Sequence, residues 1–112
     1  MNFLTIYKEA DAAGDTAARR AEPVPMVVTS GVKEWVVDEG LCGFAWITFA
    51  GNTGWGRWTK ETGVAKKSFE GGYRIWVSQY NQSWTRKKAY AEAFVKVLQT
   101  YGIAAQAQSR LD

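Results

Sequence analysis

Tryptophan and positively charged side chains gather in the segment from Trp55 to Lys88. The segment holds four of the six tryptophans and eight of the fourteen Lys and Arg residues, and Glu61 and Glu70 are its acidic residues. Phosphate groups pair with Lys and Arg while nucleobases stack on Trp or Tyr, so this mixture suits a ligand that is both anionic and aromatic. The alternative has equal weight: the tryptophans belong to a core and the lysines to a solvated surface.

A predicted strand in this segment brings a cation and an indole together. Arg74 and Trp76 are two residues apart in YRIWVSQ, so they share one face of the strand, and Tyr73 lies on the other. We expect Trp76 or Tyr73 to stack a base while nearby arginines hold phosphates. The full set of candidate ligand-binding residues is Arg57, Trp58, Arg74, Trp76, Asn81, Ser83, Trp84, Arg86 and Lys87.

The start of the last predicted helix is unusually basic. Arg86, Lys87 and Lys88 follow Ser83 within the first turns, where the helix dipole disfavours each cation by about 0.3–1 kcal/mol. A bound anion would reverse that penalty and also use the free backbone N–H groups. A well-hydrated surface cluster that tolerates a small cost is the alternative.

Charge is divided unevenly along the chain. Residues 1–50 carry four Lys or Arg against seven Asp or Glu, a net of −3, whereas residues 51–112 carry ten against four, a net of +6. The basic half indicates an anionic partner, with nucleic acid among the possibilities. The opposite charges of the two halves also favour self-association, so we predict a homo-oligomer, a dimer or higher.

Residue types needed for common enzyme chemistry are scarce. The sequence has no histidine, and Cys42 is its single cysteine, so neither a Cys-His pair nor a zinc knuckle is available. No glycine-rich stretch has the spacing of a phosphate-binding loop. We therefore expect no enzymatic activity, no cofactor and no metal. The lack of a signal peptide or a long apolar run predicts a cytoplasmic protein without membrane contact.

The predicted elements form one α+β domain over residues 1–112. They are an N-terminal helical segment at 1–22, which Gly14 weakens, a mostly stranded region at 26–82 with a short inserted helix, a long helix at 83–101 and a final strand at 103–109. We expect the long helix to cover one face of an antiparallel sheet.

The strand within GFAWITFA is the clearest of these elements. Both of its alternating faces are largely apolar, which predicts a central strand covered on both sides. This pattern places Trp46 in the core, and we expect the same of Trp35.

Several motifs resemble a family of small proteins from tailed bacteriophages. They are CGFAW, FEGGYRIWV and the ending RKKAYAEAF…GI…SRLD, and the similarity runs from about Tyr7 to Asp112. The resemblance implies a phage accessory protein that acts on host machinery, and it supplies no catalytic residues. Such proteins include oligomeric sponges that trap nucleotide second messengers of host immunity.

Three functions follow as hypotheses. The first is a phage counter-defence sponge that sequesters a nucleotide-like anion in a basic, aromatic pocket. The second is a single-stranded nucleic-acid binder, in which the same residues lie along a groove. The third is a protein–protein inhibitor of a host enzyme, with Trp55, Arg57 and Trp58 as its hot spot.

Overall fold

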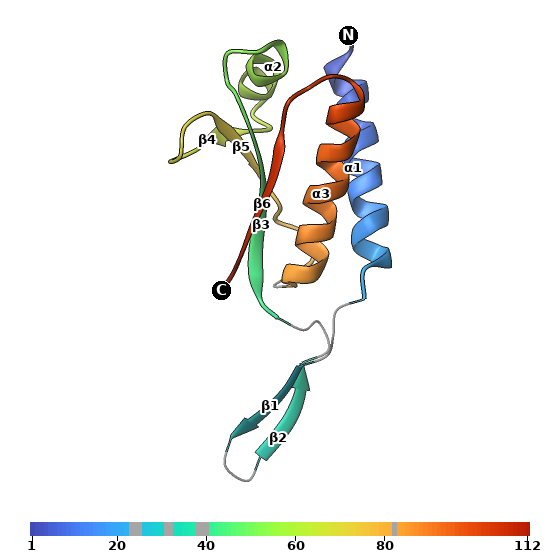
Figure 1. The fold of residues 1–112 in the computed structure, drawn as a ribbon, viewed down its shortest axis with the longest axis vertical. Helices are drawn as coiled ribbons and strands as arrows, with labels where there is room; N and C mark the ends of the chain where they lie inside the picture. The colour runs from blue at the N-terminus through green and yellow to red at the C-terminus, as the bar shows by residue number, and fades with distance from the viewer. Residues whose placement is uncertain (23–25, 31–32, 38–40, 82) are drawn as a thin grey trace.

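The computed structural model describes residues 1–22, 26–30, 33–37, 41–81 and 83–112, and for 26–30 and 33–37 it describes the backbone alone. Three helices and two antiparallel sheets make up these residues (Figure 1). The expectation for Trp35 falls outside the described side chains. The expectation of an α+β domain with a long C-terminal helix is confirmed.

The larger sheet has the strand order β4-β5-β3-β6, with every neighbour antiparallel. Its strands are β3 (Gly43–Phe49), β4 (Lys66–Lys67), β5 (Tyr73–Trp76) and β6 (Gln106–Leu111). β4 and β5 form the predicted hairpin around Gly71 and Gly72. The final strand lies further along the chain than the predicted 103–109. β1 (Met26–Ser30) and β2 (Lys33–Val37) form a separate hairpin that projects from one end of the molecule (Figure 1).

Helices cover one face of this sheet. The long helix α3 (Trp84–Thr100) lies against β3 and β6, and α1 (Phe3–Arg20) packs along α3 (Figure 1). The core between them contains Ile47, Ile75, Phe94 and Leu98, each at most 7% exposed. We call the face toward α3 the inner face of the sheet and the other face the outer face.

The helix α1 runs unbroken through Gly14, contrary to the expected weak point. A Cβ at Gly14 would lie 2.6 Å from a ring carbon of Tyr90, so the glycine allows α3 to approach closely. This packing offsets the roughly 1 kcal/mol that a glycine costs inside a helix.

The short helix α2 (Gly54–Thr62) forms as its capping residues predict. The Thr53 hydroxyl accepts a hydrogen bond from Gly56 N at 3.0 Å, and Gly63 ends the helix with φ 76°. Left-handed φ values favour glycine, which explains the stop. The helix places Trp55 in the core with an exposure of 1%, edge-on to Phe49 at the end of β3.

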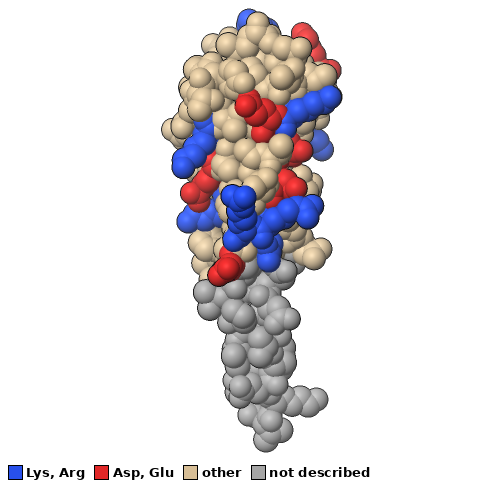
Figure 2. Space-filling model, turned by 90° about the vertical axis from the view of Figure 1, so that its right-hand side faces the viewer, with Lys and Arg blue, Asp and Glu red and all other residues tan. Residues whose placement is uncertain are grey.

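The helical side of the molecule carries both signs of charge. Lys and Arg side chains alternate with Asp and Glu side chains over α1 and α3, and no single-sign patch dominates the visible surface (Figure 2). On this face, charges from the acidic and the basic half of the sequence are therefore mixed.

Candidate outer-face binding site

The outer face of the sheet is built by the alternate residues of its strands. Trp46 pairs with Trp76 on one side and with Gln108 on the other, so these three side chains point the same way. The pairing of the remaining residues extends this set. The outer-face residues are Phe44, Trp46, Thr48, Lys66, Arg74, Trp76, Gln106, Gln108 and Arg110.

Three aromatic rings lie together on this face, with a guanidinium group at each end. Trp46 and Trp76 stack with centroids 5.4 Å apart and planes 11° from parallel, and Phe44 lies 5.5 Å from Trp76. The Arg74 guanidinium carbon is 5.2 Å from the Trp76 ring centre, and that of Arg110 is 5.3 Å from the Phe44 ring centre. We name these five residues the outer-face row. Each guanidinium is thus held against a ring by cation–π attraction.

Phe69 extends the row at the β4–β5 turn. Its side chain is 96% exposed, and its ring centre lies 5.5 Å from the Arg74 guanidinium carbon. A fully exposed phenylalanine gains nothing from burial within this chain, and exposed aromatic rings often mark binding surfaces. Phe69 is therefore positioned to contact a ligand that lies on the row.

Two hollows flank the pair Arg74 and Trp76. One has a volume of about 340 Å³ and reaches from Phe69 and Glu70 to Arg110, and the other, of about 370 Å³, is lined by Val64, Lys66 and Ser78. Volumes of this size fall at the lower end of small-ligand sites. Each hollow can therefore hold one nucleotide-sized unit beside the shared Trp76.

Positive charge predominates on the outer face. Lys66, Arg74 and Arg110 contribute three cations, while Glu70 is the acidic residue among those lining the two hollows. The cations suit phosphate oxygens, and a carboxylate such as Glu70 can accept a hydrogen bond from an exocyclic amino group of a base. The arrangement therefore suits an anionic, aromatic ligand.

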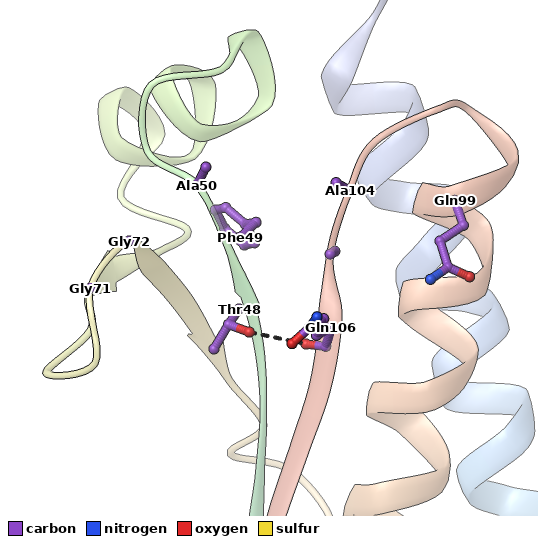
Figure 3. Close-up of a pocket in the computed structure, with 9 residues that line it drawn as sticks. Thr48, Phe49, Ala50, Gly71, Gly72, Gln99, Ala104 and Gln106 are labelled. Carbon is purple, nitrogen blue, oxygen red and sulfur yellow. Dashed lines mark hydrogen bonds between the residues drawn. The ribbon is translucent and has the colours of Figure 1, made fainter.

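Another hollow, of about 490 Å³, lies at the C-terminal end of β3. It is lined by Phe49 and Ala50 after the last β3–β6 pair, by the Gly71–Gly72 turn, and by Gln99 and Ala104 on the far side (Figure 3). Thr48 Oγ1 donates to Gln106 O at 3.5 Å at its base. Among the described residues, no charged side chain lines this hollow, so it does not suit a phosphate-bearing ligand.

The candidates in α2 lie away from the row. Trp58 is half-buried and stacks on the core residue Trp55 at 5.3 Å, and Arg57 is exposed and donates to Asn52 O at 3.3 Å. α2 and the start of α3 lie toward opposite ends of the molecule (Figure 1). The candidate residues therefore do not converge on one site, and burial of Trp55 removes it as an exposed hot-spot anchor.

The candidates at the start of α3 take part in the fold. Ser83 is 1% exposed and caps the helix by accepting from Arg86 N at 3.3 Å, while Trp84 N donates to Leu41 O at 3.0 Å. Lys87 is 4% exposed, with its Nζ 3.5 Å from Gly43 O. These contacts give Trp84 N, Arg86 N and the Lys87 ammonium partners within the chain, and an anion at this helix N-terminus stays a prediction.

Two further candidates flank this cap. Asn81 is exposed and has a positive φ of 51°, and Trp84 is half-buried against Gly43, where a Cβ would come within 2.7 Å of its indole. Lys88 lies 5.0 Å from the Trp84 ring centre and 3.8 Å from Glu92. Of the nine predicted site residues, the structure places Arg74 and Trp76 on the outer face.

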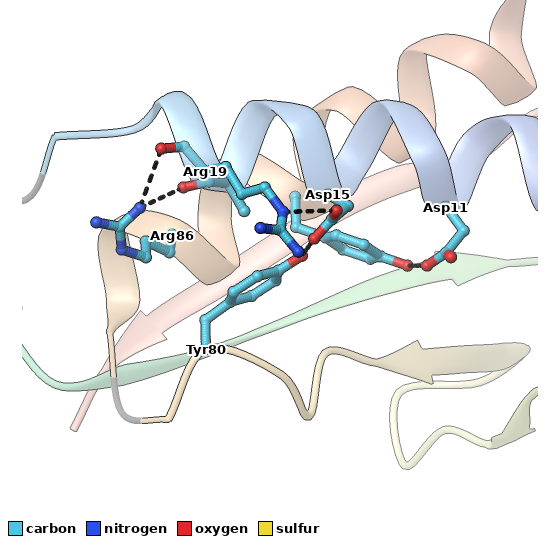
Figure 4. Close-up of polar contacts among 7 residues, drawn as sticks. Asp11, Asp15, Arg19, Tyr80 and Arg86 are labelled. Atoms are coloured by element: carbon cyan, nitrogen blue, oxygen red, sulfur yellow. Dashed lines mark hydrogen bonds and ion pairs between the residues drawn. The ribbon is translucent and has the colours of Figure 1, made fainter.

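Arg86 joins α3 to the end of α1. Its Nη1 donates to Ala18 O at 2.7 Å and to Arg19 O at 3.4 Å, which are carbonyls of the last turn of α1 (Figure 4). A cation at this end of a helix is favoured by the helix dipole, and the carbonyls there lack partners within the helix. Arg86 therefore stabilises helix packing, and its role as a phosphate-binding residue stays a prediction.

We predict that Arg86→Ala lowers the free energy of unfolding by about 1.5–3 kcal/mol, the usual worth of hydrogen bonds to a charged group. Urea unfolding checks this value. Lys88→Ala is the matched control, because Lys88 belongs to an exposed pair worth about 0–1 kcal/mol. Equal destabilisation by the two variants would contradict the structural role of Arg86.

Tyrosine hydroxyls also tie α1 to the rest of the domain. Tyr80 donates to Asp15 at 2.8 Å, and Tyr90 on α3 donates to Asp11 (Figure 4). Burial, and then the hydrogen bond to the carboxylate, raises the pKa of both phenols well above their usual range. The hydrogen bond from Tyr80, followed by that from Arg19, lowers the pKa of Asp15.

The raised phenol pKa values predict loss of stability at alkaline pH. The folded state holds these protons more tightly, so their contribution is complete below the unfolded pKa of about 10 and falls as pH rises beyond it. Asp15 acts in the opposite sense: its contribution is present above about pH 3.9 and falls as pH drops toward its folded pKa. Unfolding midpoints measured from pH 3 to 11 check both limbs. A Tyr80→Phe, Tyr90→Phe double variant that keeps the full alkaline decline would contradict this origin.

Several outer-face residues were not predicted as ligand contacts, although the alternation of residues in β3 indicates which of them share a face. Trp46 was expected in the core, yet it lies on the outer face, half-buried and stacked on Trp76, because α3 covers the other face of β3. The even-numbered residues Phe44, Trp46 and Thr48 alternate with the buried Ala45 and Ile47. That alternation was visible, but the register that joins it to Trp76 and Arg110 was not.

Comparisons with known proteins identify no relative of this chain. No protein-family model matches the sequence, and neither the curated proteins nor the solved structures contain a match. Within the described ranges, no helix has the length and apolar character needed to cross a membrane. The same residues contain no group of three or more Cys, Asp or Glu side chains placed to hold a metal ion.

Proposed function

We propose that this protein is a non-enzymatic binder of single-stranded nucleic acid and that the outer face of its sheet is the binding surface. The observation that carries the proposal is the outer-face row, in which three neighbouring rings are flanked by a guanidinium group at each end, over three neighbouring strands. Sequence-independent binders of single strands combine the same two contacts, aromatic side chains that stack bases and cations that hold the phosphate backbone.

The openness of the face favours a strand over a free nucleotide. The row crosses β5, β3 and β6, and the two hollows lie on either side of Trp76 instead of closing into one pocket. A strand can occupy both hollows in succession, with one base against Trp76 and Trp46 and phosphates near Arg74 and Arg110. Phe69 then contacts the strand at the end of the row.

A free nucleotide-like anion is the second candidate. The hollow between Phe69 and Trp76, of about 340 Å³, supports it because aromatic and cationic side chains both line that hollow. This is the sponge hypothesis, with Arg74 and Trp76 kept and the residues of α2 and α3 left out. The resemblance of the sequence motifs to those of tailed-phage proteins is the basis for including a phage accessory role in either proposal.

Salt dependence of binding tests the proposed function. On a single strand, each phosphate neutralised contributes about −0.7 to the slope of log binding constant against log salt concentration. Three cations on the outer face therefore predict a slope of about −2. Affinity for a labelled 12-nucleotide single strand should then fall about 20-fold between 50 and 200 mM salt. Fluorescence anisotropy gives this value. Absence of binding, or binding insensitive to salt, would contradict the proposal.

Competition separates the two candidates. An unlabelled 12-nucleotide strand should displace the labelled strand at far lower concentration than a mononucleotide or a cyclic dinucleotide does. Equal competition by a cyclic dinucleotide would favour the free-nucleotide function instead.

A further inference from the structure

The strand β6 has one unpaired edge. It pairs with β3 on one side, and in the part of the chain that the structure describes no strand pairs with its other side. Asp112 N donates to Cys42 O at 3.0 Å. Because hydrogen-bonded pairs alternate along an antiparallel ladder, this bond shows which residues of β6 bond to β3. The even-numbered residues of β6 thus direct their N–H and C=O groups to β3, and Ala107, Ser109 and Leu111 direct theirs outward. β6 also lacks the proline, lysine and bulge that commonly protect an edge strand.

A groove beside this edge has small residues on its walls. Ala91, Ala107 and Ser109 line a hollow of about 300 Å³ between α3 and β6, with Lys88 and Glu92 at its rim. At the end of the same strand, Leu111 is 52% exposed. Leu111 lies opposite Gly43 in the register, so it belongs to the inner-face side, as do Ala107 and Ser109. An exposed apolar side chain and a groove of small side chains therefore lie on the same side of one strand.

Antiparallel pairing of two β6 strands brings these features together. With Ser109 on the two-fold axis, Leu111 of each copy lies across from Ala107 of the other, beside the groove. On the outer-face side Arg110 lies across from Gln108 of the second copy, so the two Arg110 side chains do not oppose one another. The groove rim carries one cation, Lys88, and one anion, Glu92. Under the same two-fold symmetry, the cation of one copy complements the anion of the other.

We infer that β6 pairs with β6 of a second copy of this chain, with Ser109 at the two-fold axis, and that the two sheets join into one. Backbone hydrogen bonds of Ala107, Ser109 and Leu111 make the junction, and Leu111 fills the groove of the other copy. The outer faces then form a continuous surface, with the row of one copy leading to that of the other through Arg110. The β6–β6 junction is formed by the strand edge and the groove, and it needs no bound ligand.

Mass in solution and a proline substitution test the junction. Light scattering should give twice the 12.5 kDa of one chain. Ser109→Pro removes the central outward N–H group without touching the β3–β6 ladder, so it should give a folded species of 12.5 kDa. Leu111→Lys should also give the monomer and keeps the test decisive if the proline variant does not fold. A monomeric parent protein, or a dimer that both variants retain, would overturn the inference. If the parent protein is monomeric, a foreign peptide strand would be the partner for this edge.

Disulfide trapping tests the register. In a Cys42→Ser background, Ser109→Cys should form a disulfide between copies under mild oxidation, because residues paired across the axis have Cα atoms about 5.5 Å apart. Ala107→Cys is the matched control on the same strand, face and edge. Its two copies would lie about 13 Å apart along the strands, beyond the reach of a disulfide. Equal cross-linking of the two variants, or none by Ser109→Cys, would overturn the proposed pairing.

Discussion

Trp76→Ala should weaken binding of a single-stranded oligonucleotide by about tenfold or more, the largest effect on binding that we expect from a single substitution. Stacking of one base on an aromatic side chain is worth about 1–3 kcal/mol, and 1.4 kcal/mol corresponds to a factor of ten. Arg74→Ala should have a comparable effect, because a charge-assisted hydrogen bond to phosphate is worth about 1.5–3 kcal/mol. Anisotropy titrations at fixed salt measure both values.

Thermal melting and a charge-matched control accompany these titrations. Trp76 is 39% exposed on the face away from the core, so its loss should change stability much less than it changes binding. Lys96→Ala removes the same charge as Arg74→Ala from an exposed position on α3, the helix on the other side of the sheet. If Lys96→Ala weakens binding as much as Arg74→Ala does, net charge and not the outer-face row determines affinity.

Trp55→Ala should lower the free energy of unfolding by about 3–5 kcal/mol, the largest effect on stability that we expect. Trp55 is 1% exposed and packs against Phe3, Phe49 and Trp58, so truncation leaves a large cavity. Such a loss is a large share of the 5–15 kcal/mol that stabilises a typical domain. Urea unfolding provides the measurement.

Two companion variants make this a test of where the tryptophans lie. Trp55→Phe keeps an aromatic ring and removes an indole N–H for which the described residues offer no hydrogen-bond partner, so it should cost much less than Trp55→Ala. Trp46→Ala should also cost less, because Trp46 is half-buried on the outer face whereas Trp55 is 1% exposed. Destabilisation by Trp46→Ala as great as that by Trp55→Ala would show that the outer face is covered.

Local patterns predicted the elements well because their signals lie within a few residues. Thr53 and Gly63 mark the ends of α2, and Tyr90, Phe94 and Leu98 recur at helical spacing in α3. The shared face of Arg74 and Trp76 follows from the two-residue repeat of a strand. These features needed no knowledge of tertiary contacts.

The composition of the site could not be read in the same way because it depends on contacts between distant residues. Trp46 and Trp76 meet through the β3–β5 register, and Arg110 reaches Phe44 through β6. The basic run at the start of α3 has the same limit, since charge in a sequence does not reveal whether a side chain contacts a ligand or a carbonyl of its own chain. Arg86 bonds to the end of α1, and Lys87 is buried beside Gly43.

Nuclear magnetic resonance titration with a 12-nucleotide single strand tests the central proposal most directly. Binding on the outer face predicts that the indole N–H signals of Trp46 and Trp76 and the amide signals of β3, β5 and β6 shift most. The indole signal of the buried Trp55 and the amides of α1 should stay nearly unchanged. Shifts confined to the helices, or no shifts at all, would contradict the outer face as the nucleic-acid binding surface.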